Sequence, residues 1–274
     1  MYPFISIFGK QISTYGIMAI IGMITVFGYT AIRCHQKKYS YNDELYFLVF
    51  CFGFLLIGAA ILYQLTILPS TISILPYLFT DFDYFRSHFS VGIVFYGGLF
   101  GVIWGACVYS KIFKQDARKM MMISTPAIPL FHIFGRIGCF LTGCCHGAVN
   151  ENFGIAYTNS ISAENGVPYL PIQLFEACGN LIIFVILCIC GRRNNKYLKP
   201  LGLYFTMYGT MRFILEFWRG DSIRGIWGPF STSQWISLIA VPLGIYCIVV
   251  SDDKNFLGKL MNHEKTNQSV SDTE

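Results

Sequence analysis

Residues 45–65 read LYFLVFCFGFLLIGAAILYQL, a run without a charged side chain. An α-helix rises about 1.5 Å per residue, so this run can cross the roughly 30 Å hydrocarbon core of a bilayer. In lipid the backbone must satisfy its own hydrogen bonds, which a helix does within one segment. The run therefore predicts a transmembrane helix.

Similar apolar runs recur along the 274 residues, of which 54% are hydrophobic and 13% charged. This composition is typical of a polytopic membrane protein and excludes an ordinary soluble domain. We predict an all-α fold with one transmembrane domain over 1–250. A polar tail at 251–274 should be disordered. We expect about seven spans, at 14–33, 45–65, 91–110, 120–142, 172–190, 200–217 and 232–250.

The positive charges predict the orientation of the chain. Fourteen of the 20 Lys and Arg residues follow the first, third and fifth spans or lie in the tail. Cytoplasmic loops carry an excess of Lys and Arg, so the N-terminus should be external and the C-terminus cytoplasmic. The external loops are then 66–90, 147–170 and 218–231. The same excess of Lys and Arg in cytoplasmic loops explains the net charge of +5. We expect no nucleic-acid partner, because no basic stripe with interleaved aromatics is present.

Two arginines lie inside apolar stretches, Arg136 in GRIGCFLTGCCHG (135–147) and Arg212 in YGTMRFILEFWR (208–219). A charge at membrane depth is costly and usually faces a polar cavity with a function. Tyr208, Arg212 and Glu216 are spaced i, i+4, i+8, which places them on one helix face. This polar stripe is either part of a functional site or a structural ion pair that fixes helix packing.

Glycines surround Arg136. Gly138, Gly143 and Gly147 permit close backbone approach or a broken helix, which is tolerated at membrane depth only around a cavity. A planar guanidinium can hold a phosphate through two parallel hydrogen bonds. The segment therefore indicates an anion site, and the alternative is a small-residue helix contact with a paired arginine.

Cys139, Cys144, Cys145 and His146 raise the question of a metal. Their spacing, C-x4-C-C-H, differs from the C-x2-C pairs of structural zinc sites, and no second ligand pair is visible. We expect no metal here. A metal site and a reactive thiol pair stay open as alternatives to simple packing and polar lining.

Two further segments offer polar or small side chains near an outer boundary. Tyr96 precedes Gly97 and Gly98 and is either a polar group in a cavity or an interfacial tyrosine. Gln173 and Glu176 are spaced i, i+3 on one helix face. Glu176 either reaches the membrane surface or completes a polar site with the arginines.

These segments together resemble bacterial prolipoprotein diacylglyceryl transferases, from about Thr14 to about Ser237. That family has seven spans and an external N-terminus. The resemblance implies transfer of the diacylglyceryl group of phosphatidylglycerol to the lipobox cysteine of a prolipoprotein signal peptide, with release of glycerol phosphate and no cofactor. It implies a multi-pass protein of the bacterial plasma (inner) membrane. The motifs are YGIM (15–18), FYGGL (95–99), GRIGCFLTG (135–143), PIQLFE (171–176) and YGTMRFILEFWR (208–219).

The resemblance also implies roles for the residues. Arg136 and Arg212 would hold the phosphate, Tyr208 would orient the substrate, and Glu216 would position Arg212. Tyr96 would complete the catalytic group. The residues that would shape or line the substrate cavity are Gly97, Gly98, Gly138, Gly143, Gly147, Gln173, Glu176 and Glu216.

The chain departs from the family pattern at several places. Tyr96 stands where the family has a histidine, Cys139 replaces an asparagine, and residues 142–144 read TGC in place of NGE. The second-span arginine is absent from 58–63, and Leu170 replaces another histidine. Two other functions therefore stay open: a related transferase with a different acceptor, and a non-enzymatic phospholipid-binding or transport protein on the same scaffold.

Overall fold

The computed structural model describes residues 2–7, 9–88, 94–193, 197–220 and 226–250. Helices predominate, and the strands form two-stranded hairpins. The contacts divide the chain into two compact units: unit 1 is Met1–Arg33 with Met121–Glu274, and unit 2 is Cys34–Met120. The single domain predicted for 1–250 stays a prediction, and the predicted tail at 251–274 lies outside the described residues.

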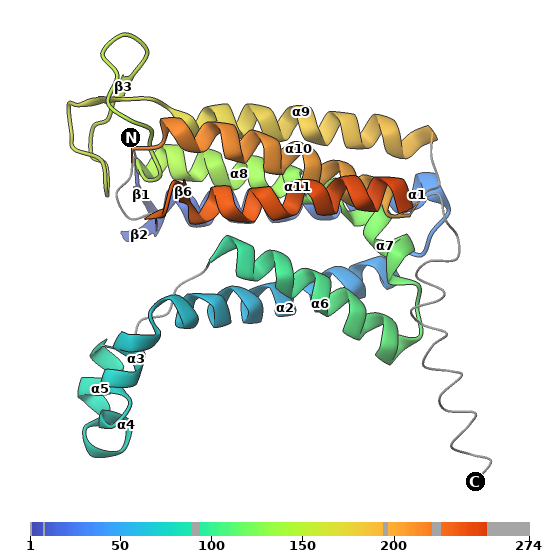
Figure 1. Ribbon diagram of the computed structural model, residues 1–274, viewed down its shortest axis with the longest axis horizontal. Helices are drawn as coiled ribbons and strands as arrows, with labels where there is room; N and C mark the ends of the chain where they lie inside the picture. The colour runs from blue at the N-terminus through green and yellow to red at the C-terminus, as the bar shows by residue number, and fades with distance from the viewer. Residues whose placement is uncertain (1, 8, 89–93, 194–196, 221–225, 251–274) are drawn as a thin grey trace. The chain divides into compact units, whose positions relative to one another are not determined.

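Unit 1 is built from long helices that lie side by side with roughly aligned axes (Figure 1). Helix α8 packs on α9, α9 on α10, and α10 on α11. Helix α1 reaches α8 at Gly22, where an added Cβ would lie 3.1 Å from the Phe131 ring. The helices are α1 (Thr14–Lys37, to Arg33 in this unit), α8 (Ala127–Thr142), α9 (Ile172–Arg193), α10 (Lys199–Leu215) and α11 (Thr232–Val250).

Short hairpins gather at one end of these helices, at the left of Figure 1. Each hairpin lies just before the first residue of a helix, so it fixes where that helix begins. A 3-10 turn, η1 (Glu216–Trp218), follows α10. The antiparallel pairs are β1 (Phe4–Ile7) with β2 (Lys10–Ser13), β3 (Ile155–Ala156) with β4 (Pro168–Tyr169), and β5 (Ile226–Trp227) with β6 (Phe230–Ser231).

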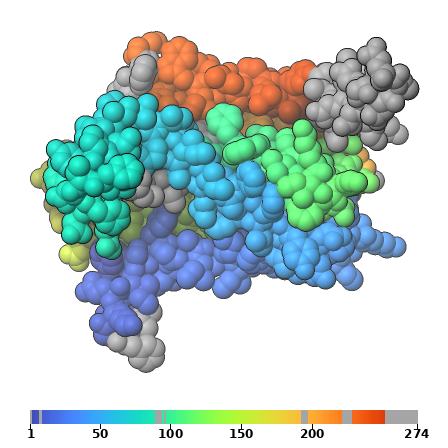
Figure 2. All heavy atoms as spheres, turned by 90° about the horizontal axis from the view of Figure 1, so that it is seen from below, coloured from blue at the N-terminus to red at the C-terminus, as the bar shows by residue number. Residues whose placement is uncertain are grey.

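Unit 2 is centred on two packed helices, α2 (Tyr41–Thr66) and α6 (Phe95–Phe113). Glycines allow their backbones to approach closely: an added Cβ at Gly58 would lie 2.9 Å from the Cα of Gly101. Small residues have this role in many membrane helix pairs. Beyond the end of α2, a cluster of short helices forms a rounded knob (Figure 2). These helices are α3 (Leu68–Ile74), α4 (Tyr77–Thr80) and α5 (Phe82–His88).

The surfaces of the long helices suit lipid. Ile24 of α1 is 66% exposed and Ile239 of α11 is 68% exposed, as expected for side chains that face hydrocarbon. Among the described residues, four helices are long and apolar enough to cross a membrane, namely α1, α2, α9 and α11. This confirms an all-α polytopic membrane protein. The number of seven spans and the orientation of the termini stay predictions.

The fourth predicted span, 120–142, is bent. Helix α7 (Ala117–Ser124) and α8 meet at an angle of 43°, with Thr125 and Pro126 between them. Proline lacks a backbone N–H and disfavours helical geometry in the residue before it, so a break at this point follows from the sequence. The pair would count as a fifth span if both helices cross together.

Candidate active site

Glu176 of α9 lies at the centre of the charged groups of unit 1. Its side chain is fully buried. The Nη2 atom of Arg136, from α8, lies 2.9 Å from Oε1 of Glu176. The Nη1 atom of Arg212, from α10, lies 3.4 Å from Oε2. One carboxylate thus holds two guanidinium groups from two helices, one on each oxygen.

Arg212 continues the pairing to a second carboxylate. Its Nη2 atom lies 2.7 Å from Oε2 of Glu216 and donates to Oγ of Ser233 at 3.3 Å. Glu216 begins the 3-10 turn just after α10, and its pairing with Arg212 persists across that change of geometry. Arg136, Glu176, Arg212 and Glu216 form an alternating chain of charges, which we call the ion cluster. Opposite partners of this kind are required when charges are removed from water.

Tyr208 and His132 complete the surroundings of Glu176. The hydroxyl group of Tyr208 donates to Oε1 of Glu176 at 3.1 Å. The Nε2 atom of His132 lies 3.9 Å from the same oxygen. His132 is not among the site residues predicted from the sequence. Its position four residues before Arg136, on the same helix face, was the signal that could have placed it here.

Arg136 retains hydrogen-bonding capacity beyond Glu176. Within the described part of the chain, no acceptor reaches its buried Nε atom. Its side chain is 14% exposed, more than that of Arg212 at 8%. A guanidinium carries five N–H donors in a planar fork, and a buried unpaired donor is costly. The geometry therefore suits an anionic ligand that would accept from Arg136.

Three chain segments join beside the cluster, at the hairpin end of unit 1. The backbone N–H of Gly147 donates to the carbonyl of Leu170 at 2.8 Å, and that of Ala148 donates to Trp218 at 2.8 Å. These bonds tie the segment after α8 to the start of α9 and the end of α10. Gly147 is required here because an added Cβ would lie 2.6 Å from Cγ1 of Ile172.

The other predicted glycines of unit 1 have packing and turn functions in the structure. An added Cβ at Gly138 would lie 3.0 Å from the ring of Tyr15 on α1. Gly143 ends α8 with φ of +76°, and its carbonyl accepts a hydrogen bond of 3.0 Å from Ser160. Contacts of Gly138, Gly143 and Gly147 with substrate stay a prediction.

Gln173 links α9 to the cysteine segment. Its buried amide Nε2 donates to the carbonyl of Cys144 at 2.7 Å. Its Oε1 accepts a 3.3 Å hydrogen bond from the hydroxyl of Tyr157, and burial raises the pKa of that phenol. Tyr157 lies in the 147–170 loop, and no pattern in the sequence marks it. Gln173 therefore supports the segment beside the ion cluster.

Tyr96, Gly97 and Gly98 belong to unit 2. A Cβ added at Gly97 would lie 2.6 Å from Cβ of Leu62, and one added at Gly98 would lie 3.2 Å from Cγ of Leu55. Both glycines thus allow α6 to pack on α2. The backbone of Tyr96 is helical, and its side chain lies outside what the structure describes. Their participation in a substrate site stays a prediction.

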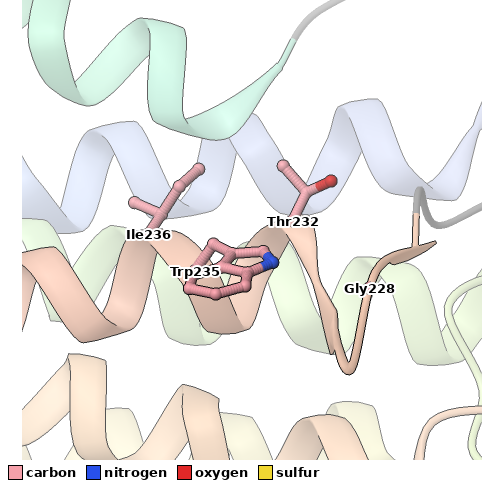
Figure 3. A pocket seen from close by; sticks show the side chains of 4 residues that line it. All are labelled: Gly228, Thr232, Trp235 and Ile236. Carbon is pink, nitrogen blue, oxygen red and sulfur yellow. The ribbon is translucent and has the colours of Figure 1, made fainter.

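An open, mainly apolar depression lies at the start of α11 (Figure 3). Thr232, Trp235 and Ile236 line it from the helix, and Gly228 lines it from the preceding turn. Ser233, which accepts from Arg212, lies on the same turn of α11. An apolar lining of this kind suits hydrocarbon better than a charged group.

Comparison with known proteins agrees with the motifs. A family model described as prolipoprotein diacylglyceryl transferase matches residues 3–250. A Clostridium tetani phosphatidylglycerol–prolipoprotein diacylglyceryl transferase is 31% identical over 243 residues, covering 88% of this chain and 93% of the relative. The second such transferase of Clostridium perfringens is 32% identical, with 87% and 91% covered. One from Geobacter sulfurreducens is 34% identical over 188 residues, with 63% and 69% covered. The chain therefore belongs to the prolipoprotein diacylglyceryl transferase family.

Proposed function

We propose that this protein transfers the diacylglyceryl group of phosphatidylglycerol to the lipobox cysteine of a prolipoprotein signal peptide. Family membership supports the reaction. The observation that carries the proposal is the convergence of Arg136 and Arg212 on the buried carboxylate of Glu176. The two guanidinium groups are held in place, and Nε of Arg136 has no acceptor among the described residues. Such an arrangement is suited to a lipid phosphate.

The reaction is a displacement at carbon. The cysteine thiol loses its proton to solvent, and the thiolate sulfur attacks the carbon of the diacylglyceryl unit that carries the phosphate; the bond from that carbon to the phosphate oxygen breaks. A thioether forms, and glycerol phosphate leaves with the electron pair. Negative charge gathers on the departing phosphate, where donors fixed in advance stabilise the transition state. Arg136 and Arg212 would supply these donors.

Glu176, Glu216 and Tyr208 would act mainly by holding the arginines and substrate in position. Glu176 contacts both guanidinium groups, and Glu216 contacts Arg212. Glu176 also accepts the hydroxyl hydrogen bond of Tyr208, which therefore lies beside the proposed phosphate site. Positioning of this kind can supply a large share of a rate enhancement.

Both proposed substrates would reach the site from the membrane. The protein is a multi-pass membrane protein, and we place it in the plasma membrane with seven spans and the hairpin end of unit 1 on the external side. Phosphatidylglycerol would enter from the bilayer, and the depression of Thr232, Trp235 and Ile236 would suit its acyl chains. The signal peptide would approach from the same leaflet.

The proposal is tested with purified protein, phosphatidylglycerol vesicles and a synthetic lipobox peptide. We expect glycerol phosphate to be released only when the peptide carries its cysteine. A peptide with serine at that position is the matched control. Release without peptide would indicate hydrolysis, and bound lipid with no release would indicate a lipid-handling protein; either result contradicts the proposal.

A further inference from the structure

Three cysteine thiols meet at the C-terminal end of α8. The Sγ atoms of Cys139, Cys144 and Cys145 all lie within 4.8 Å of one another. Cys139 is buried, the other two are half-buried, and all three are free thiols. In the described residues this is the one group of three or more His, Cys, Asp or Glu side chains with metal-binding geometry.

The backbone explains how cysteines with this unusual spacing converge. Helix α8 ends at Gly143, which is left-handed with φ of +76°. The N–H of Cys144 then donates to the carbonyl of Cys139 at 3.1 Å, so the chain folds back over the last turn. Cys145 is also left-handed, with φ of +58°, a conformation that costs energy for a residue with a side chain. Together these features bring the thiols of Cys144 and Cys145 close to the thiol of Cys139.

The thiol cluster lies next to the ion cluster along two helices. Cys139 follows Arg136 by three residues on α8, and Gln173 precedes Glu176 by three residues on α9. The amide of Gln173 donates to the carbonyl of Cys144. Three residues of helix span roughly 4.5 Å, so the thiols lie about one turn outward from the pair of Arg136 and Glu176.

We propose that Cys139, Cys144 and Cys145 form a three-thiolate binding site for a zinc ion. Zinc lies about 2.3 Å from each thiolate sulfur, which places three sulfurs roughly 4 Å apart. The three Sγ atoms, all within 4.8 Å of one another, are compatible with this spacing. Soft thiolate ligands favour zinc over magnesium or calcium. The guanidinium of Arg136, one turn away, would offset the excess negative charge of three thiolates around a divalent ion.

The site would have an open coordination position. Within the described residues, the group contains three protein ligands and no fourth. Zinc sites with three protein ligands keep the remaining tetrahedral position for water or another small ligand. Bound zinc would also crosslink the end of α8 to the 144–145 turn. This inference does not depend on the proposed transferase activity.

The test measures metal binding on the full chain in detergent, kept reduced and first stripped with a chelator. After zinc is added and excess is removed, we expect one zinc per chain by mass spectrometry of the metal. Cadmium in its place should give the ultraviolet thiolate-to-metal absorption of three sulfur ligands. Zinc should also raise the apparent Tm, since it binds the folded state.

Single substitutions Cys139→Ser, Cys144→Ser and Cys145→Ser should each weaken zinc binding by at least about 100-fold, since even supporting residues of metal sites contribute 10- to 100-fold. Cys178→Ser, an exposed thiol on α9, is the matched control and should bind zinc as the wild type does. Failure of the wild type to retain zinc, or equal retention by a triple Cys139, Cys144 and Cys145 variant, would overturn the proposal. The thiolate-to-cadmium absorption of the wild type requires no variant, so it tests for three sulfur ligands even if a variant misfolds.

Discussion

At the scale of single residues, Glu176 holds the charged site together. It is fully buried and contacts both Arg136 and Arg212, while Tyr208 donates to it. Removal of a buried charge leaves its partners uncompensated, and such losses typically destabilise a protein by about 3–5 kcal/mol. The cluster is therefore both a source of structural order and the proposed phosphate site.

We expect Glu176→Gln to lower the apparent Tm and to reduce transfer by at least about 100-fold, because both guanidinium groups lose their anchor. Thermal unfolding in detergent and the glycerol phosphate assay measure the two effects. Glu151→Gln, an exposed carboxylate in the 147–170 loop, is the matched control and should change neither. Full activity of Glu176→Gln would show that the Glu176 carboxylate is not needed for transfer.

Arg212→Lys tests geometry apart from charge. Arg212 reaches Glu176, Glu216 and Ser233 with two nitrogen atoms of one planar group. A lysine ammonium is a single point and cannot span the same partners. We expect a fall in kcat/KM of about 100-fold or more with normal membrane insertion. Arg118→Lys, whose arginine pairs locally with Asp116, should retain activity. Equal activity of the two variants would show that charge alone suffices at position 212.

Arg212→Ala removes the charge as well as the fork, and we expect it to abolish transfer while the protein still inserts in the membrane. Its long apolar helices, not this side chain, provide the length and hydropathy needed to cross. Membrane fractionation and the glycerol phosphate assay measure the two properties. An active Arg212→Ala variant would refute the role proposed for this arginine.

Several site residues could be predicted from sequence because their signals are local. Arg136 and Arg212 are charges within apolar runs, and Tyr208, Arg212 and Glu216 share a helical period. The sequence left open whether Glu176 reaches the membrane surface or joins the arginines, because the answer depends on how three helices pack; in the structure it contacts both arginines. The sequence also left open whether Cys139 meets Cys144 and Cys145, because their convergence depends on a left-handed turn that the spacing does not reveal.

At the scale of elements, the long apolar runs became helices near the predicted bounds, with α1 at Thr14–Lys37 for 14–33 and α9 at Ile172–Arg193 for 172–190. Hydropathy predicts such helices well because lipid offers the backbone no hydrogen-bond partners, so the segment must satisfy its own N–H and C=O groups. The bend between α7 and α8 follows from Pro126. The hairpins could not be predicted, since their strands are short and their pairing depends on helix ends.

The α2–α6 pair provides a test of packing. We expect Gly101→Ala to destabilise unit 2, because the new Cβ would lie 2.9 Å from the carbonyl carbon of Phe54. Overpacking of this kind typically costs about 1–3 kcal/mol. Gly53→Ala on α2 has open space around it and should be neutral or slightly stabilising. Thermal unfolding of both variants checks this, and equal apparent Tm values would contradict the close contact.

At the scale of the whole molecule, the charge distribution predicts the orientation in the membrane. The excess of Lys and Arg after alternate spans places the C-terminus in the cytoplasm. A fluorescent protein fused after residue 274 should therefore fluoresce, and alkaline phosphatase at the same point should be inactive. Phosphatase fused after Pro229, in the predicted external loop 218–231, should be active. The reverse pattern would invert the proposed topology.

The proposed reaction forms a thioether between a lipobox cysteine and a diacylglyceryl group. The most direct measurement is the mass of a lipobox peptide after incubation with the protein and phosphatidylglycerol. We predict a gain of one diacylglyceryl group, located on the cysteine and absent from the serine peptide. An unmodified cysteine peptide in the presence of folded protein with bound phosphatidylglycerol would contradict the account.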